Sequence, residues 1–262
     1  MFNLFKKPAG SCFDVPLIQI CTYMKLPVIH GYIDRRILVN FTVAPEAVQP
    51  LLPAPFRPKI YKGKAIAGIC LIRLKHIKPK GWPDFTGISS ENGAHRIAVE
   101  WEENGVTKEG VYIPRRDTSS RLNALAGGRI FPGKHHLARF DVREAGGHYH
   151  IAFASADKTF LSVDARSTNE FPVTSVFGTL ENASAFFAGG AVGYSPNERQ
   201  SLDGLKLQTY QWQVSPLQLL QVSSSFFEDT AVFKNGSVTF DNALLMTRIE
   251  HEWHTLTGCP QP

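Results

Sequence analysis

The sequence lacks a long hydrophobic run. Its most apolar stretch, residues 183–193, is short and rich in glycine, whereas a membrane span needs about 20 consecutive apolar residues. The N-terminal lysines Lys6 and Lys7 are not followed by an extended apolar segment, so the pattern of a secretory signal is missing. We therefore expect a protein without membrane partners, located in the cytoplasm.

Cysteine is also scarce, and its spacing is irregular. The chain holds four cysteines and no C-x-x-C pair. Disulfide-stapled domains and zinc knuckles both need more regular cysteine patterns. The sequence therefore predicts scattered, reduced thiols in a cytosolic protein. The four positions are Cys12, Cys21, Cys70 and Cys259.

Charge is sparse and balanced. Lys and Arg number 28 against 23 Asp and Glu, which gives a net charge of +5 over 262 residues. The only local basic cluster is Lys75, Lys78 and Lys80, which a solvated loop explains. Nucleic-acid binding needs a concentrated basic face, so we expect no nucleic-acid partner.

Several catalytic motifs are absent as well. The sequence contains neither the G-x-x-x-x-G-K-[ST] loop of nucleotide-binding proteins nor the G-x-S-x-G elbow of α/β-hydrolases. No period of 20–50 residues divides it. We expect an N-terminal extension over residues 1–27 and one domain over residues 28–262, with no cofactor.

The hydrophobic patterns predict an α+β domain dominated by strands. β-branched and aromatic residues favour strands, and the run over residues 65–74 is apolar enough to be buried on both faces. Asn104-Gly105 predicts a hairpin turn. Helices are expected over 45–52, 118–131 and 179–188. The expected strands cover residues 37–43, 65–74, 97–101, 110–114, 134–143, 148–155, 205–214, 217–226 and 238–250.

One hairpin can be predicted residue by residue. A turn at Gly146-Gly147 pairs Arg143 with His150 and Phe140 with Phe153. Because side chains alternate along a strand, the same parity places Lys134 and His136 on the core side. A desolvated lysine is a candidate nucleophile for carbonyl groups. The alternatives are a bulge after Gly133, or a Lys134 side chain that reaches solvent at the strand end.

Two histidine pairs offer metal-binding alternatives. His148 and His150 share a strand face, but that face also carries the charged side chains of a solvated surface. His251 and His254 lack the spacing of a zinc protease. We therefore assign no metal site.

Two stretches resemble a known superfamily. The first is Arg35-Arg36-Ile-Leu-Val-Asn-Phe-Thr-Val-Ala-Pro-Glu-Ala-Val-Gln-Pro-Leu-Leu-Pro53, and the second runs from Asp117-Thr-Ser-Ser-Arg-Leu122 to Phe131-Pro-Gly-Lys134. With the tail 224–254, they resemble the acetoacetate decarboxylase-like superfamily, most closely the bacterial YqjF-like family of unknown function. The resemblance implies a closed β-barrel or cone with a few peripheral helices around an apolar cavity.

The resemblance also implies a site, with one departure. True decarboxylases have two adjacent lysines after Phe-Pro, the first of which forms a Schiff base; here Gly133 stands in the place of that lysine and only Lys134 remains. The family's cavity arginine and glutamate correspond by order to Arg35 or Arg36 and to Glu91, with Arg96 or Glu100 as alternatives.

Two functions follow from these residues. In the first, the protein is a lyase-type enzyme for a keto acid or other carbonyl compound: Lys134 is the candidate catalytic residue, Glu91 assists, and Arg36, Arg96 and His136 bind the substrate. In the second, a non-enzymatic protein holds a small apolar or carboxylate ligand in the barrel. The sequence does not decide whether the protein is an enzyme, and it leaves self-association into a homo-oligomer open.

Overall fold

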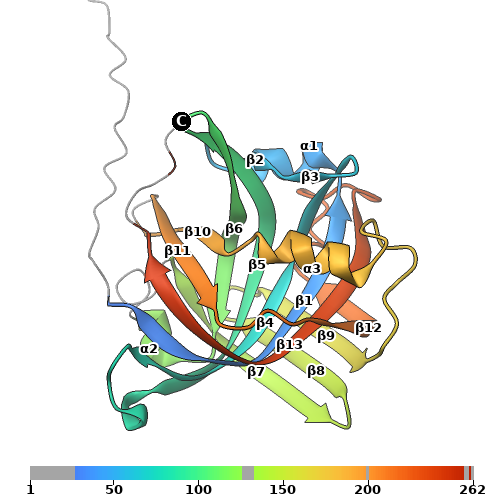
Figure 1. Cartoon of the computed structure of the whole chain (residues 1–262). Helices are drawn as coiled ribbons and strands as arrows, with labels where there is room; N and C mark the ends of the chain where they lie inside the picture. The colour runs from blue at the N-terminus through green and yellow to red at the C-terminus, as the bar shows by residue number, and fades with distance from the viewer. Residues whose placement is uncertain (1–26, 126–132, 199–200, 257–259, 261–262) are drawn as a thin grey trace, which may run out of the picture.

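The computed structural model describes residues 27–125, 133–198, 201–256 and 260. The expected N-terminal extension lies outside these residues, apart from residue 27. Long, strongly curved strands dominate the chain, and short helices lie on the sheet (Figure 1). The α+β class expected from the sequence is confirmed. The elements are β1 Ile29–Val43, α1 Pro45–Val48, η1 Gln49–Leu51, β2 Arg57–Pro58, β3 Ile60–Tyr61, β4 Lys64–Pro79, η2 Asp84–Thr86, β5 Ile88–Glu103, β6 Val106–Thr118, α2 Arg121–Leu125, β7 His135–Ala145, β8 His148–Ser155, β9 Phe160–Ser167, α3 Leu180–Ala188, β10 Val192–Pro196, β11 Leu202–Thr209, β12 Ser215–Ser224 and β13 Val238–Thr255.

The strand pairings close into two circuits. The sheet order is β11-β10-β6-β7-β8-β9-β12-β13-β1-β4-β5-β2, and the additional pairs β5–β6 and β11–β13 join it back on itself. One circuit runs β13-β1-β4-β5-β6-β10-β11, and the other runs β13-β1-β4-β5-β6-β7-β8-β9-β12. The five strands β13, β1, β4, β5 and β6 belong to both, so this shared sheet has two covered faces.

Both faces of the shared sheet are apolar. One face carries Ile37, Ile69 and Ile97 into the main core, which also receives side chains from β8 and β9. The opposite face carries Leu38, Cys70 and Ala98 into a second core, where Phe187 of α3 packs on them. The nearly continuous burial of residues 65–71 confirms the expectation for this strand.

The hairpin prediction is confirmed in its pairing. Arg143 pairs with His150 and Phe140 with Phe153, around Gly146 and Gly147, which both have positive φ. The Asn104-Gly105 turn and α3, capped by the Thr179 side chain, are also where they were expected.

Several local predictions differ from the structure. β4 continues to Pro79 through residues expected to form a loop, because Ile77 is buried and β1 pairs with Lys78 and Pro79. The strands β9, Phe160–Ser167, and β10, Val192–Pro196, were not expected. The strand predicted over 205–214 is β11, which ends at Thr209. α2 spans only Arg121–Leu125, and residues 126–132 of the predicted helix lie outside the described residues.

Candidate functional site

Three arginines project from the α3-covered face of the shared sheet. Arg36 lies in β1, Arg96 in β5 and Arg116 in β6. In the register of the sheet, Cys70 of β4 stands between Leu38 and Ala94, and Ala94 pairs with Arg116. Arg36 is two residues from Leu38 in β1, and Arg96 is two residues from Ala94 in β5. Because side chains alternate in a strand, the three arginines and Cys70 share one face.

Arg96 is the most deeply buried of the three. It is 5% exposed, and its guanidinium lies 4.8 Å from the centroid of the Phe187 ring, a cation–π contact. One Nη donates a hydrogen bond to Oδ1 of Asn40. Its Nε has no hydrogen-bond partner. Burial lowers the pKa of Arg96 to about 10, so the side chain is still charged at neutral pH.

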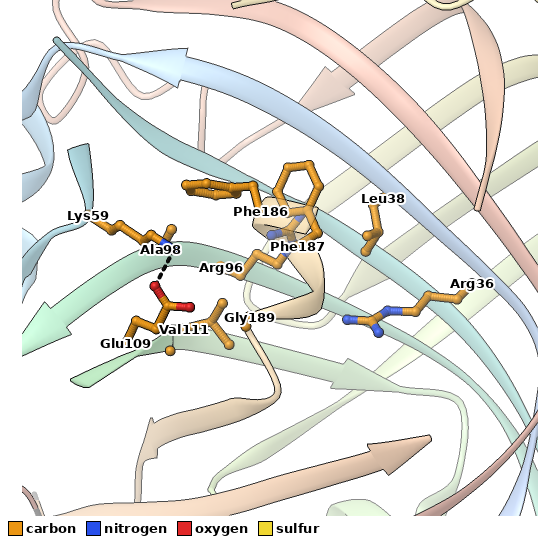
Figure 2. Close-up of a pocket in the computed structure, with 12 residues that line it drawn as sticks. Arg36, Leu38, Lys59, Arg96, Ala98, Glu109, Val111, Phe186, Phe187 and Gly189 are labelled. Atoms are coloured by element: carbon orange, nitrogen blue, oxygen red, sulfur yellow. Dashed lines mark hydrogen bonds and ion pairs between the residues drawn. The ribbon is translucent and has the colours of Figure 1, made fainter. Parts of the chain in front are cut away.

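Arg36 shares a cavity with Arg96. The half-buried Arg36 side chain donates a hydrogen bond from Nε to Sγ of Cys70, 3.3 Å away. Figure 2 shows its guanidinium reaching from β1 toward the side of the pocket where Arg96 lies. The cavity has a volume of about 20 Å³. Phe186 and Phe187 of α3 form part of its wall, and at its rim Lys59 forms an ion pair with Glu109.

Arg116 lines a second cavity of about 60 Å³ on the same face. Its Nε donates a hydrogen bond to Oγ of Ser195 at 2.9 Å, and burial lowers its pKa to about 10. Cys70 and His135 line this cavity too. Burial, reinforced by the charge of Arg116, lowers the pKa of His135 to about 3, so this imidazole is neutral at physiological pH.

No carboxylate neutralises the three arginines within the described part of the chain. The carboxylates on the cavity walls belong to other cations: Glu109 pairs with Lys59, and Asp117 pairs with Arg115. Asp203 attracts Arg116 but forms no ion pair with it, and instead accepts the Gly133 amide at 2.9 Å. Buried cations without counterions are energetically costly. The site is therefore poised to receive an anion.

The predicted residues are divided between separate places. Arg36 and Arg96 line one cavity. Glu91 lies elsewhere, because it forms ion pairs with Arg35 at 2.6 Å and with Arg73. His136 is half-buried, with Nδ1 3.8 Å from a carboxylate oxygen of Asp157.

The predicted inward orientation of Lys134 is wrong. Its side chain is exposed and lines neither arginine cavity. The residue precedes β7, which begins at His135, and its amide donates to the Pro196 carbonyl at 3.2 Å. The alternation of β7 therefore does not extend back to Lys134, and its side chain reaches solvent at the strand end.

Position 133 is closed to a side chain. A Cβ atom on Gly133 would lie 2.5 Å from the Ser195 Cβ and 3.6 Å from the Arg116 Nε. The backbone there has φ +83°, which disfavours any residue with a Cβ. Ser195 and Arg116 thus occupy the space toward which a side chain at this position would point.

Arg116 and Cys70 are the site residues that sequence reasoning missed. Arg116 lies in the hairpin strand β6, but the β5–β6 register shifts between Tyr112 and Arg115, so alternation from the Asn104-Gly105 turn would place it on the wrong face. Cys70 had no signal of its own beyond its place in a buried strand.

The candidate metal ligands are engaged otherwise. His148 and His150 both contact the Asp164 carboxylate, at 2.7 and 3.2 Å. Across the residues whose placement is described, no group of three or more His, Cys, Asp or Glu is arranged to hold a metal ion. In that same part of the chain, no helix is both long and apolar enough to cross a bilayer.

Comparison with known families identifies one match. The family model DUF2071, described as an uncharacterized conserved protein, matches residues 33–247. No curated protein matches the chain.

Solved structures share its architecture across nearly their whole length. The enduracididine biosynthesis enzyme MppR complexed with pyruvate is 13% identical, with a TM-score of 0.54, and the match covers 96% of this chain and 99% of MppR. An acetoacetate decarboxylase-like enzyme from Sphingomonas wittichii RW1 is 10% identical, with a TM-score of 0.55 and coverages of 95% and 100%. Acetoacetate decarboxylase from Legionella pneumophila is 12% identical, with a TM-score of 0.53 and coverages of 96% and 98%. At these identities the likeness shows the fold, which is acetoacetate decarboxylase-like.

Proposed function

The chain belongs to the DUF2071 family, and we propose that this member is a binding protein for a small carboxylate, which it holds among Arg36, Arg96 and Arg116. The observation that carries the proposal is the set of three guanidinium groups on one covered sheet face, without a carboxylate partner among the described residues. A bound carboxylate would supply the missing negative charge and accept charge-assisted hydrogen bonds.

The cavity volumes set the size of the ligand. They are about 60 and 20 Å³, and on this scale one water molecule needs about 10–15 Å³. The space suits a few non-hydrogen atoms. This size and the buried charges favour a short carboxylate over a larger apolar ligand. Pyruvate is a suitable first probe because the structurally similar enzyme MppR is described as complexed with it.

Calorimetric titration of the full chain with pyruvate, acetate and the neutral amide of pyruvate tests the proposal. We expect the two carboxylates to bind and the amide to fail. Arg36→Gln and Arg116→Gln should each weaken binding about 10- to 100-fold, which corresponds to one charge-assisted hydrogen bond. Arg57→Gln is the matched control, because Arg57 pairs with Glu100 and Glu102 at the exposed surface. Equal binding of the acid and its amide, or no binding of any short carboxylate, would overturn the proposal.

A lysine-dependent reaction on a keto acid is the second candidate. It is favoured by the position of Lys134 directly after Gly133, whose Cβ direction leads to Arg116. Borohydride reduction in the presence of pyruvate tests it, because a Schiff base would leave a stable mass increment on Lys134. We expect no such increment in this structure, and finding one would make the protein an enzyme candidate again.

A further inference from the structure

Cys70 brings a thiol, a strong nucleophile, to the arginine cluster. Its Sγ accepts the hydrogen bond from Arg36 Nε at 3.3 Å, and its thiol lines the 60 Å³ cavity together with Arg116. Both Arg96 and Arg116 interact electrostatically with it. The residue is 5% exposed, so it meets only molecules that enter the cavity.

A second feature indicates that a ligand belongs beside this thiol. Arg96 is nine-tenths buried, yet its Nε lacks any hydrogen-bond partner, and its guanidinium lines the neighbouring cavity with Arg36. An anion placed between these arginines would supply the negative charge that no carboxylate among the described residues gives them. The sheet register puts Cys70 between the strands that carry Arg36 and Arg96, and Arg36 donates to its sulfur, so the thiol borders the same group of guanidinium groups.

We propose that Cys70 captures the bound ligand covalently, and that the ligand is a short carboxylate with an electrophilic carbon next to the carboxylate, as in a 2-oxo acid. This inference rests on the proposed function. The sulfur forms a bond to the carbonyl carbon, the C=O π bond breaks, and the thiol proton passes to the resulting oxygen. The product is a hemithioketal, and no oxidant or leaving group is required. The surrounding guanidinium groups stabilise the negative charge that develops on sulfur and then on oxygen.

The position of Cys70 gives the site a group that can react with the carbonyl of a ligand, although Lys134 does not point into either cavity. Arginine contacts hold the carboxylate and exclude neutral carbonyl compounds. The thiol then discriminates 2-oxo acids from simple acids such as acetate, which have no electrophilic carbon in that position. Selectivity therefore comes from two separate chemical groups.

Alkylation with two reagents of nearly equal size tests the electrostatic part. Iodoacetate carries a carboxylate and iodoacetamide does not. In the native full chain, peptide mass spectrometry should show that the rate ratio of iodoacetate to iodoacetamide at Cys70 is at least tenfold higher than at Cys12, Cys21 and Cys259, which serve as internal references. Pyruvate should slow the labelling of Cys70 alone. Arg116→Gln should return the ratio at Cys70 to the reference value.

The covalent step has its own readout. Pyruvate labelled with ¹³C at the carbonyl carbon should give a new tetrahedral-carbon NMR signal with the wild-type protein. Cys70→Ser should abolish this signal, while the triple variant C12S/C21S/C259S should retain it. An ordinary reagent ratio at Cys70, or a signal that persists in Cys70→Ser, would overturn the inference. If pyruvate binds by calorimetry but neither effect appears, the binding function stands and the covalent capture fails. If acetate binds but pyruvate does not, the covalent capture alone fails, and if no short carboxylate binds, both fail.

Discussion

Arg35 and Arg36 are neighbours in β1, but their guanidinium groups have opposite electrostatic surroundings. Arg35 is 2% exposed and forms ion pairs with Glu91, at 2.6 Å, and with Glu144. Within the described part of the chain, Arg36 contacts the sulfur of Cys70 and no carboxylate. Because adjacent residues of a strand point to opposite faces, two consecutive arginines serve different purposes. Arg35 links neighbouring strands through its ion pairs, and Arg36 lines the cavity in which we propose that an anion binds.

This contrast predicts unequal stability effects. Arg35→Gln should lower the free energy of unfolding by about 1–3 kcal/mol, because it removes a buried cation from its ion pairs with the half-buried Glu91 and with Glu144. Arg36→Gln should change it by less than about 1 kcal/mol. Urea denaturation of the two variants compares them directly. Similar losses for both would show that Arg36 is also a structural cation.

Restoring a side chain at position 133 should destabilise the protein. Gly133→Ala places a Cβ atom against Ser195 at a residue with φ +83°, and we expect a loss of about 1–3 kcal/mol. Ser195→Gly should remove the clash with the new Cβ atom, but not the strain of the positive φ at position 133. A double-mutant cycle by chemical denaturation separates the two terms, and a fully additive cycle would mean that the contact with Ser195 is unimportant.

The polar chain behind Arg96 should position it for binding. Asn40 accepts from Arg96 and donates to Asn242 Oδ1 at 2.8 Å, and Asn242 donates to Asp241 at 2.6 Å. Asn40→Ala should cost about 1–3 kcal/mol of stability, because it leaves buried donors and acceptors unpaired. It should also weaken pyruvate binding. Asn40→Asp keeps an acceptor toward Arg96 but adds a carboxylate beside it, so it should weaken pyruvate binding even where the variant is folded, and unchanged binding would show that the missing counterion is unimportant.

Stability should fall in mild acid. The pKa of His251 is lowered to about 4 by burial, and burial likewise lowers the pKa of His95 to about 4. An unfolded histidine protonates near 6.5, so between these values the unfolded state binds more protons. Stability is therefore complete above pH 6.5 and declines as the pH drops toward 4, by up to about 1.4 kcal/mol per pH unit for each histidine.

Denaturation curves at several pH values measure this slope. His251→Leu should reduce the slope of the unfolding free energy against pH by the contribution of one histidine. His76→Asn is the control, because His76 is exposed and its positive φ of 53° is tolerated by asparagine. An unchanged slope in His251→Leu would assign the acid sensitivity to other groups.

Local features of the fold followed from the sequence because their causes are local. The Gly146-Gly147 hairpin was predictable to the residue, since two glycines define the turn and alternation then determines both faces. The Lys134 prediction failed at the place where that reasoning crossed from the strand into the connection before it. There, the hydrogen bond to Pro196, from a distant part of the chain, determines the backbone direction.

The sequence by itself determined the α+β class, most strands and the glycine in place of the expected lysine, because composition, turns and period-two patterns act over a few residues. It also singled out Arg36 and Arg96. Only the tertiary structure decided that these two meet Arg116 and Cys70 on one face while Glu91 goes to another. The physical reason is that the cavity depends on the register between β1, β4, β5 and β6, and on the packing of α3 over them.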